Sequence, residues 1–169
     1  MSQIFDLFGK KVPKYNLRFR ESMFKKYSIQ GGTSSRRESL GKVFETNYEL
    51  YSYAFFIGLY LDEYVELPQK ERVDFSQPIQ FWGNKSGHRE NFAYIQKAIF
   101  SAVIVKEKSI NWLELEKGNI EEDSVVKTLI SSVEAYTNGG LIYLDGKINE
   151  HPGILSQLFF LELMQDIKK

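Results

Sequence analysis

Apolar side chains recur at helical spacing over much of the chain. Residues 17–29 (LRFRESMFKKYSI) predict a short basic amphipathic helix, because every third or fourth position is apolar. Its apolar positions are Phe19, Met23, Phe24 and Tyr27. Residues 36–64 carry two apolar stripes, which indicates a central helix packed on more than one side. Gly58 inside this helix costs about 1 kcal/mol relative to alanine, so we expect it to mark a close approach of a second helix.

The second half of the chain predicts further helices. One begins at Gly87 and runs toward Val105, and a short helix or turn covers Ile110–Glu116. Three carboxylates, starting at Glu121, favour another helix start because they complement the positive end of the helix dipole. Asn138-Gly139-Gly140 predicts the end of that helix, since glycine adopts the left-handed C-cap conformation at low cost. A last helix is expected over Gly153–Lys168.

Three segments lack a sustained period. Residues 1–16 look irregular, and residues 30–35 form a glycine-containing break after which Ser35 and Glu38 fit a capping box. Residues 65–86 form a long connection interrupted by Pro68 and Pro78, which lack backbone donors. Four of its side chains are too apolar for a free loop, and we expect them to pin the segment to the body or to a partner. They are Phe75, Ile79, Phe81 and Trp82.

This pattern predicts an all-α fold, a single-domain bundle of about five or six helices with a long proline-containing connection. Within it we expect a basic N-terminal arm with a short helix over residues 1–35, followed by a helical domain over 36–169. The length of 169 residues and the hydrophobic share of 43% are sufficient for one folded core.

Composition excludes several kinds of site. The chain has no cysteine, which rules out disulfides, thiolate zinc sites, iron–sulfur clusters and a cysteine nucleophile. It has no run of about 18 apolar residues that could span a membrane, and its first residues do not resemble a secretory signal. We therefore expect a cytoplasmic protein with no membrane contact. Aromatic residues make up 15%, which indicates an aromatic core or an aromatic surface for a partner.

The charge is unevenly spread although the net charge is zero. Residues 1–42 hold ten basic and three acidic side chains, a net charge of +7, and the remaining residues hold 12 basic and 19 acidic ones, a net charge of −7. Six basic residues are interleaved with aromatic ones, a combination that can hold phosphates and stack bases. They are Arg18, Arg20, Lys25, Lys26, Arg36 and Arg37. The alternative is that the basic segment pairs with the acidic remainder, within the molecule or across subunits.

Candidate chemistry is sparse. The two histidines, His88 and His151, lack a second ligand at metal-binding spacing. No phosphate-binding glycine motif or nucleophile elbow is present, so we predict no metal, cofactor or catalytic residue. Among the carboxylates, Glu134 has the best case because it stands beside Tyr136 and Asn138, although a solvated or helix-pairing role is the simpler interpretation.

Two stretches resemble a known family. FETNYELYSYAFFIGLYLDEYVEL (Phe44–Leu67) and EAYTNGGLIYL (Glu134–Leu144) are similar to segments of small accessory proteins associated with bacterial DNA phosphorothioation (Dnd-type) loci. Thr137 departs from that pattern, which has a small apolar residue at this position. The resemblance implies an accessory protein of a prokaryotic DNA-modification or anti-phage defence system, working with larger subunits such as an ATPase or a nuclease. It carries over no catalytic residues.

We therefore expect a non-catalytic interaction subunit that acts through protein–protein contacts. Its candidate partner-binding residues are Phe75, Ile79, Phe81, Trp82, Tyr136 and Asn138. The alternative is a nucleic-acid-binding module that contacts DNA or RNA through the basic segment. A carboxylate-based enzyme is a third hypothesis, and self-association stays open.

Overall fold

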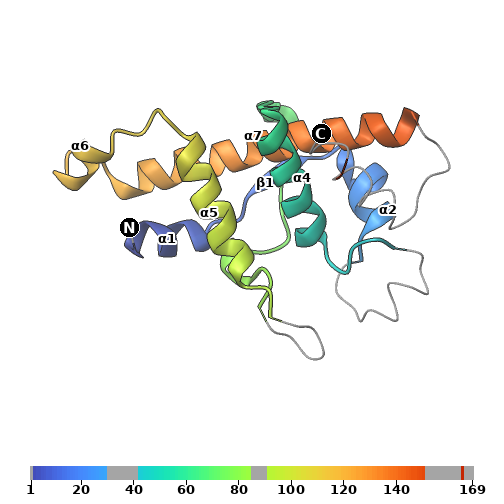
Figure 1. Cartoon of the computed structure of the whole chain (residues 1–169), viewed down its shortest axis with the longest axis horizontal. Coiled ribbons are helices and arrows are strands. Elements are labelled where there is room, and N and C mark those ends of the chain that lie inside the picture. The colour runs from blue at the N-terminus through green and yellow to red at the C-terminus, as the bar shows by residue number, and fades with distance from the viewer. Residues whose placement is uncertain (1, 30–41, 85–90, 151–164, 166–169) are drawn as a thin grey trace. The chain divides into compact units, whose positions relative to one another are not determined.

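The computed structural model describes residues 2–29, 42–84, 91–150 and 165, and these residues are mostly helical (Figure 1). The α-helices are α1 (Ser2–Gly9), α2 (Lys25–Tyr27), α4 (Asn47–Leu61), α5 (Tyr94–Lys106), α6 (Trp112–Glu116) and α7 (Glu122–Glu150). A π-helical turn, η1 (Arg20–Phe24), leads into α2, and the 3₁₀ turns η2 (Gln69–Glu71) and η3 (Ile79–Phe81) interrupt the long connection. The prediction of a mostly helical fold is confirmed.

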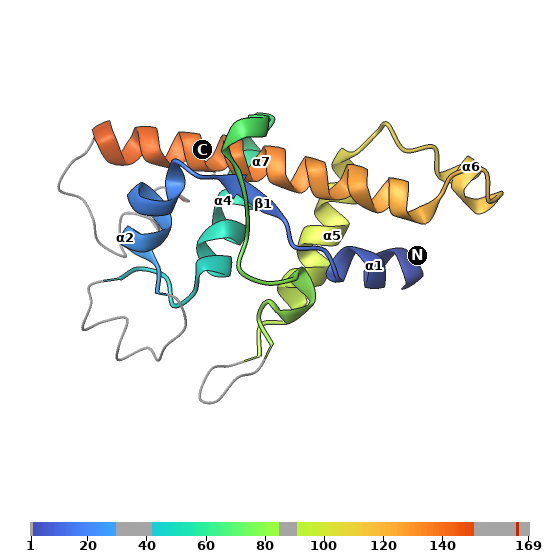
Figure 2. The same ribbon diagram turned by 180° about the vertical axis from the view of Figure 1, so that it is seen from behind.

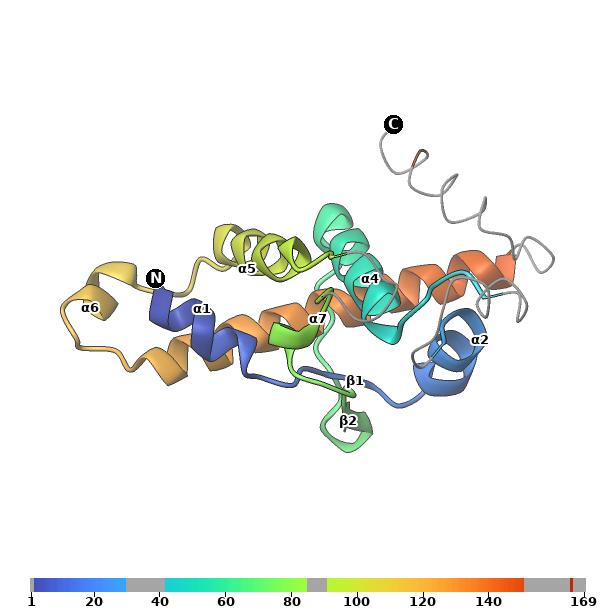
Figure 3. The same cartoon turned by 90° about the horizontal axis from the view of Figure 1, so that it is seen from below.

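A small sheet departs from the all-α prediction. Strand β1 (Lys14–Asn16) pairs antiparallel with β2 (Arg72–Asp74), and Tyr15 lies opposite Val73 (Figure 3). Three-residue strands are too short to show the alternating pattern that identifies a strand in a sequence. Residues 1–16 were also predicted to be irregular, yet they contain α1 and β1.

The contacts divide the chain into two compact units, each made of two stretches. Unit 1 spans Met1–Asn16 and Glu66–Ala135, and unit 2 spans Leu17–Val65 and Tyr136–Lys169. The division into 1–35 and 36–169 stays a prediction, and in the contacts residues 1–16 group with the long connection and with α5. The predicted boundary itself lies outside the described residues.

The core of unit 1 is built from aromatic rings. In α1, the Phe8 ring lies 5.2 Å from the ring of Phe100 in α5, so the two helices lie side by side (Figure 2). In the connection, the Phe75 ring packs edge-on against Trp82 at 5.4 Å. Phe8, Ile79 and Trp82 are completely shielded from solvent. The aromatic-rich composition thus supplies this core.

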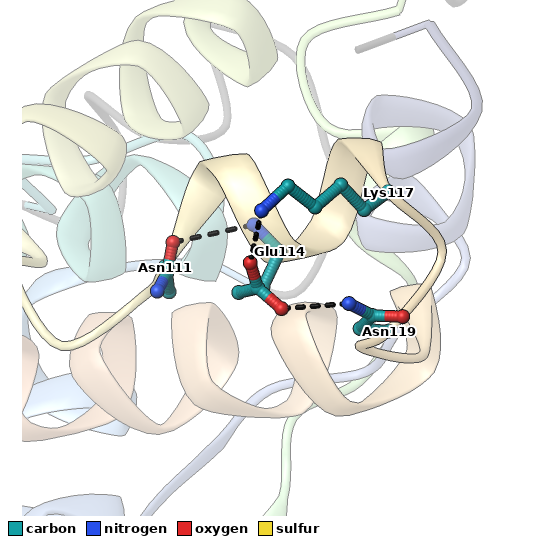
Figure 4. Close-up of polar contacts among 4 residues, drawn as sticks. All are labelled: Asn111, Glu114, Lys117 and Asn119. Carbon is teal, nitrogen blue, oxygen red and sulfur yellow. Dashed lines mark hydrogen bonds and ion pairs between the residues drawn. The ribbon is translucent and has the colours of Figure 1, made fainter.

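Helix α6 in unit 1 is stabilised by its own polar side chains (Figure 4). The Asn111 side chain caps its first turn by accepting from the Glu114 backbone N–H at 3.2 Å. The Glu114 carboxylate accepts from Lys117 Nζ at 2.8 Å and from Asn119 Nδ2 at 2.7 Å. The bond from Lys117 and then the one from Asn119 lower the pKa of Glu114. The segment Ile110–Glu116, predicted to be a short helix or turn, contains the helix Trp112–Glu116.

Unit 2 centres on the contact of α4 with the second half of α7. A Cβ placed on Gly58 would lie 1.9 Å from the Tyr136 carbonyl oxygen, and one placed on Gly140 would lie 1.8 Å from the Ala54 oxygen. These two glycines therefore let the two helix backbones touch, which confirms the close approach expected at Gly58. The predicted helix end at Asn138-Gly139-Gly140 is wrong, because α7 continues to Glu150.

Helix α4 begins later than predicted. Its first residue is Asn47 rather than residue 36, and Thr46 caps it by accepting from the Glu49 N–H at 3.3 Å. The Ser28 hydroxyl donates to Asn47 Oδ1 at 2.6 Å, which joins the end of α2 to the start of α4. The predicted capping box at Ser35 and Glu38 lies outside the described residues, as does the predicted last helix except for residue 165.

Candidate binding surfaces

The predicted basic helix at residues 17–29 has the expected two-sided character. Its apolar side chains Phe19, Met23, Phe24 and Tyr27 are buried in unit 2, at 3% exposure or less. Four basic side chains stand on the solvent side, and we call Arg18, Arg20, Lys25 and Lys26 the basic face. Arg36 and Arg37 lie outside the described residues.

Local contacts order the basic face without covering it. The Arg18 guanidinium lies 4.4 Å from the centre of the Phe19 ring, and Lys26 Nζ lies 5.4 Å from the centre of the Tyr27 ring. Lys25 pairs with Glu21 at 2.6 Å, and both side chains stay largely exposed. An exposed ion pair of this kind contributes about 1 kcal/mol or less, so the positive charge remains accessible to a partner.

The burial of the rings changes what this surface can do. The nucleic-acid hypothesis included base stacking on the interleaved aromatic rings, but Phe19, Phe24 and Tyr27 form the inner side of the helix. The stacking part of the nucleic-acid hypothesis is therefore wrong for these rings. Contact with phosphates through Arg18, Arg20, Lys25 and Lys26 stays a prediction.

Most of the predicted partner-binding residues of the long connection are buried. Phe75, Ile79 and Trp82 lie in the core of unit 1, and the Trp82 indole N–H donates to the Gln77 carbonyl at 3.1 Å. These three side chains are therefore not surface contacts for a partner. The connection uses them to attach itself to unit 1. Phe81 differs, with 51% of its side chain exposed.

The backbone brings the segment that contains Phe81 next to two further exposed rings. The Phe92 N–H donates to the Gly83 carbonyl at 2.7 Å, so η3 and the start of α5 meet two residues from Phe81. Phe92 and Tyr94 are 43% and 66% exposed, and their rings lie 6.2 Å apart. We call Phe81, Phe92 and Tyr94 the aromatic surface.

Two features define the backbone geometry of this junction. Gly83 has a φ of +73°, and a Cβ there would lie 2.4 Å from the Phe92 oxygen, so only glycine fits the turn. The Gln96 amide donates to the carbonyls of Gln80 at 3.0 Å and Trp82 at 2.7 Å. The backbone that carries the aromatic surface is therefore held by several hydrogen bonds.

Tyr136 and Asn138, the remaining predicted partner-binding residues, are buried in unit 2. The Tyr136 ring packs edge-on against Tyr64 at 5.1 Å, and Asn138 Nδ2 donates to the Val65 carbonyl at 3.0 Å. Their exposed fractions are 8% and 2%. Both side chains attach the segment after α4 to α7. They are therefore buried packing contacts and not the surface contacts for a partner that were predicted.

Glu134 is neither solvated nor paired along its helix. Its side chain is buried in unit 1, and Oε1 accepts from the Lys14 backbone N–H at 2.7 Å, which fixes β1 to α7. Burial raises the pKa of Glu134, an effect reinforced by Asp74 and opposed by the Lys14 N–H and by the charges of Arg72 and Lys14. This geometry stabilises the fold and gives no indication of acid–base chemistry.

The described residues also limit metal and membrane interpretations. Among them, no group of three or more His, Cys, Asp or Glu side chains is placed to hold a metal ion. Both histidines, His88 and His151, lie outside the described residues. Across the same described segments, no helix has the length and apolar content that crossing a membrane requires.

The sequence did not predict that Phe92 and Tyr94 belong to an exposed aromatic surface. The sequence predicted a helix from Gly87, but α5 begins at Tyr94 and leaves Phe92 before its first turn. The polar stretch before Phe92 favours a loop and could have indicated the later start. Comparison of this chain with protein-family models, curated proteins and solved structures gives no significant match.

Proposed function

We propose that this chain is a non-catalytic interaction subunit that binds a larger protein through the aromatic surface of unit 1. The observation that carries the proposal is the exposure of Phe81, Phe92 and Tyr94 on a backbone held by several hydrogen bonds. Aromatic side chains are enriched at the centres of protein interfaces, where burying each ring removes a large area from water.

The ordering of the junction favours binding. A surface already held in place loses little conformational freedom when a partner docks, so more of the interaction energy remains as affinity. The bond from Phe92 to Gly83 and the two Gln96 bonds provide such ordering before any partner arrives. The neighbouring side chains of Asn84 and Asn91 are exposed and suit a polar rim.

The proposed partner is a larger subunit, such as an ATPase or nuclease, of a prokaryotic DNA-modification or anti-phage defence complex. The resemblance of Phe44–Leu67 and Glu134–Leu144 to Dnd-associated accessory proteins supports this setting. The aromatic surface supports only the mode of binding, which is protein–protein contact.

The test is co-purification from native-host cells, with nuclease added so that nucleic acid does not bridge proteins. A retained protein is then purified and titrated with the wild-type chain and with the double variant Phe81→Ser/Tyr94→Ser. We expect the variant to bind at least about tenfold more weakly, since losing one interface anchor costs about 1.4 kcal/mol or more.

The matched control is Leu113→Ser in α6. Leu113 belongs to the same unit and is similarly exposed, at 59%, but lies outside the aromatic surface. It should bind like the wild type. Equal affinities of wild type and double variant, or the absence of any co-purifying protein, would contradict the proposal.

A further inference from the structure

Helix α5 in unit 1 has an uncharged face that points away from the core. Side chains three or four positions apart lie on the same side of a helix, and four such residues form what we call the outer face of α5: Tyr94, Ala98, Ser101 and Val105. Tyr94 and Val105 are 66% and 78% exposed. Ser101 is exposed and Ala98 is half-buried, whereas the buried residues of α5 lie on the opposite side of the helix.

The aromatic surface adjoins the first turn of α5. The Gln96 amide in this turn donates to the carbonyls on both sides of Phe81. Tyr94 belongs to the aromatic surface and to the outer face, and its ring lies 6.2 Å from that of Phe92. Exposed apolar residues are ordinary where they are scattered, whereas a continuous group indicates a contact surface. The outer face therefore extends the aromatic surface along α5 as far as Val105.

The outer face is complementary to itself when two copies of α5 run antiparallel. Residues 94 and 105 lie equally far from a point between residues 99 and 100, and so do residues 98 and 101. An antiparallel pair centred on this point places Tyr94 of each copy level with Val105 of the other copy. It also places Ala98 level with Ser101, and such small side chains let two helices approach closely. Each contact then occurs twice about a two-fold axis, as in the commonest homodimers.

The area of this surface fits a reversible dimer. At exposures between 43% and 66%, the three rings of the aromatic surface offer about 300 Å² on each copy. The rest of the outer face is about 10 Å long and about 10 Å wide, which adds about 100 Å². Two copies would bury at most about 800 Å² in total, which is less than the roughly 1,600 Å² of a standard stable complex and typical of transient ones.

We propose that two copies of this chain pair through their outer faces, with the two α5 helices antiparallel, as a reversible two-fold dimer. This dimer goes beyond the binding of a larger protein proposed above. Both contacts use Tyr94, so the second copy and the larger protein compete for one surface. The chain thereby shields its most exposed apolar side chains until the larger protein displaces the second copy.

Sedimentation velocity over a range of protein concentrations measures the association. The wild type should shift from monomer to dimer as its concentration rises, and the dimer should persist at high salt, which screens ionic contacts but not apolar ones. Ser101→Arg places a cation of each copy beside the two-fold axis, so dimerisation should weaken at least about tenfold through like-charge repulsion. The matched control is Ser131→Arg, the same change at an exposed serine of α7 in unit 1, which should dimerise like the wild type. Circular dichroism verifies that both variants are folded.

Cysteine cross-linking tests the antiparallel arrangement. The chain contains no cysteine, so one introduced cysteine reports on one position. In the proposed dimer the two copies of residue 101 are about 4.5 Å apart along the helix axes, and the two copies of residue 97 are about 7.5 Å apart. A disulfide requires Cα atoms within about 7 Å of each other. Under mild oxidation Ser101→Cys should form a covalent dimer, whereas Lys97→Cys, which is also exposed on α5, should not.

Three outcomes would overturn the proposal. One is a wild type that stays monomeric at every soluble concentration, and another is a dimer that Ser101→Arg does not weaken. The third is equal cross-linking of Ser101→Cys and Lys97→Cys, which would indicate a parallel pair or random collisions. If Ser101→Arg does not fold, the two cysteine variants decide. None of these outcomes bears on the larger protein, because the three rings of the aromatic surface are unchanged in every variant.

Discussion

The contact between α4 and α7 predicts opposite effects for two glycine-to-alanine substitutions. In Gly58→Ala, the new methyl group would lie 1.9 Å from the Tyr136 carbonyl oxygen, whereas a carbon and a carbonyl oxygen normally stay about 3.3 Å apart. The obstacle is backbone, which cannot rotate away as a side chain can. The two helices must therefore separate by more than about 1 Å.

The free energies can be compared directly. Forcing an extra methyl group into a packed core costs about 1–3 kcal/mol, and a clash with backbone belongs at the upper end. Alanine recovers about 1 kcal/mol through its higher helix propensity. We expect Gly58→Ala to lower the free energy of unfolding of unit 2 by about 2 kcal/mol.

Gly146→Ala is the matched control because it lies in α7 with no atom within 4 Å of the added methyl group. Only helix propensity changes there, so unit 2 should become more stable by about 1 kcal/mol. Urea unfolding followed by circular dichroism measures both variants, and hydrogen exchange of residues 54–61 assigns the change to α4. A Gly58→Ala variant as stable as the wild type would refute the packing argument.

Three further substitutions test other contacts. Burial raises the pKa of Glu134 above its usual 4.5, so the folded state binds the proton of this carboxyl group more tightly than the unfolded state does. Unit 1 should therefore lose stability as the pH rises from 4.5 through the raised pKa. Glu134→Gln should remove this pH dependence of the unfolding free energy while keeping an acceptor for Lys14. Trp82→Ala should destabilise unit 1 by about 3–5 kcal/mol in urea unfolding, because it empties a fully buried site. Thr46→Ala removes the N-cap of α4 and should lower the thermal stability of unit 2 by about 1 kcal/mol.

Helical periodicity predicted the existence of most helices but not their limits. The apolar stripe of residues 17–29 and the tight packing at Gly58 could be inferred because each depends on local spacing or on one unusual residue. The start of α4 was misplaced because apolar residues on both sides of the Thr46–Glu49 cap keep helical spacing, so the stripe continues across it. The end of α7 was misplaced because glycine occurs both at helix ends and at close helix–helix contacts. Only the position of the neighbouring helix shows which of the two roles applies.

The binding surfaces were predicted less completely, because exposure depends on tertiary packing. An apolar connection indicated burial or a partner, and the structure shows that Trp82 is buried whereas the adjacent Phe81 is exposed. No local rule separates two neighbouring aromatic residues in an irregular segment. The pairing of β1 with β2 joins residues about 60 positions apart in the chain and left no signal in either three-residue strand.

The bond between Gly83 and Phe92 also determines where this protein can accept new sequence. These two residues are in direct contact through the Phe92 N–H and the Gly83 carbonyl, so the described positions that flank residues 85–90 are held close together. A longer segment inserted there would leave the ends in place, and each doubling of its length would cost only about 0.6 kcal/mol of closure entropy. An epitope or fluorescent tag inserted there would stand beside the aromatic surface and could report its occupancy without altering either terminus.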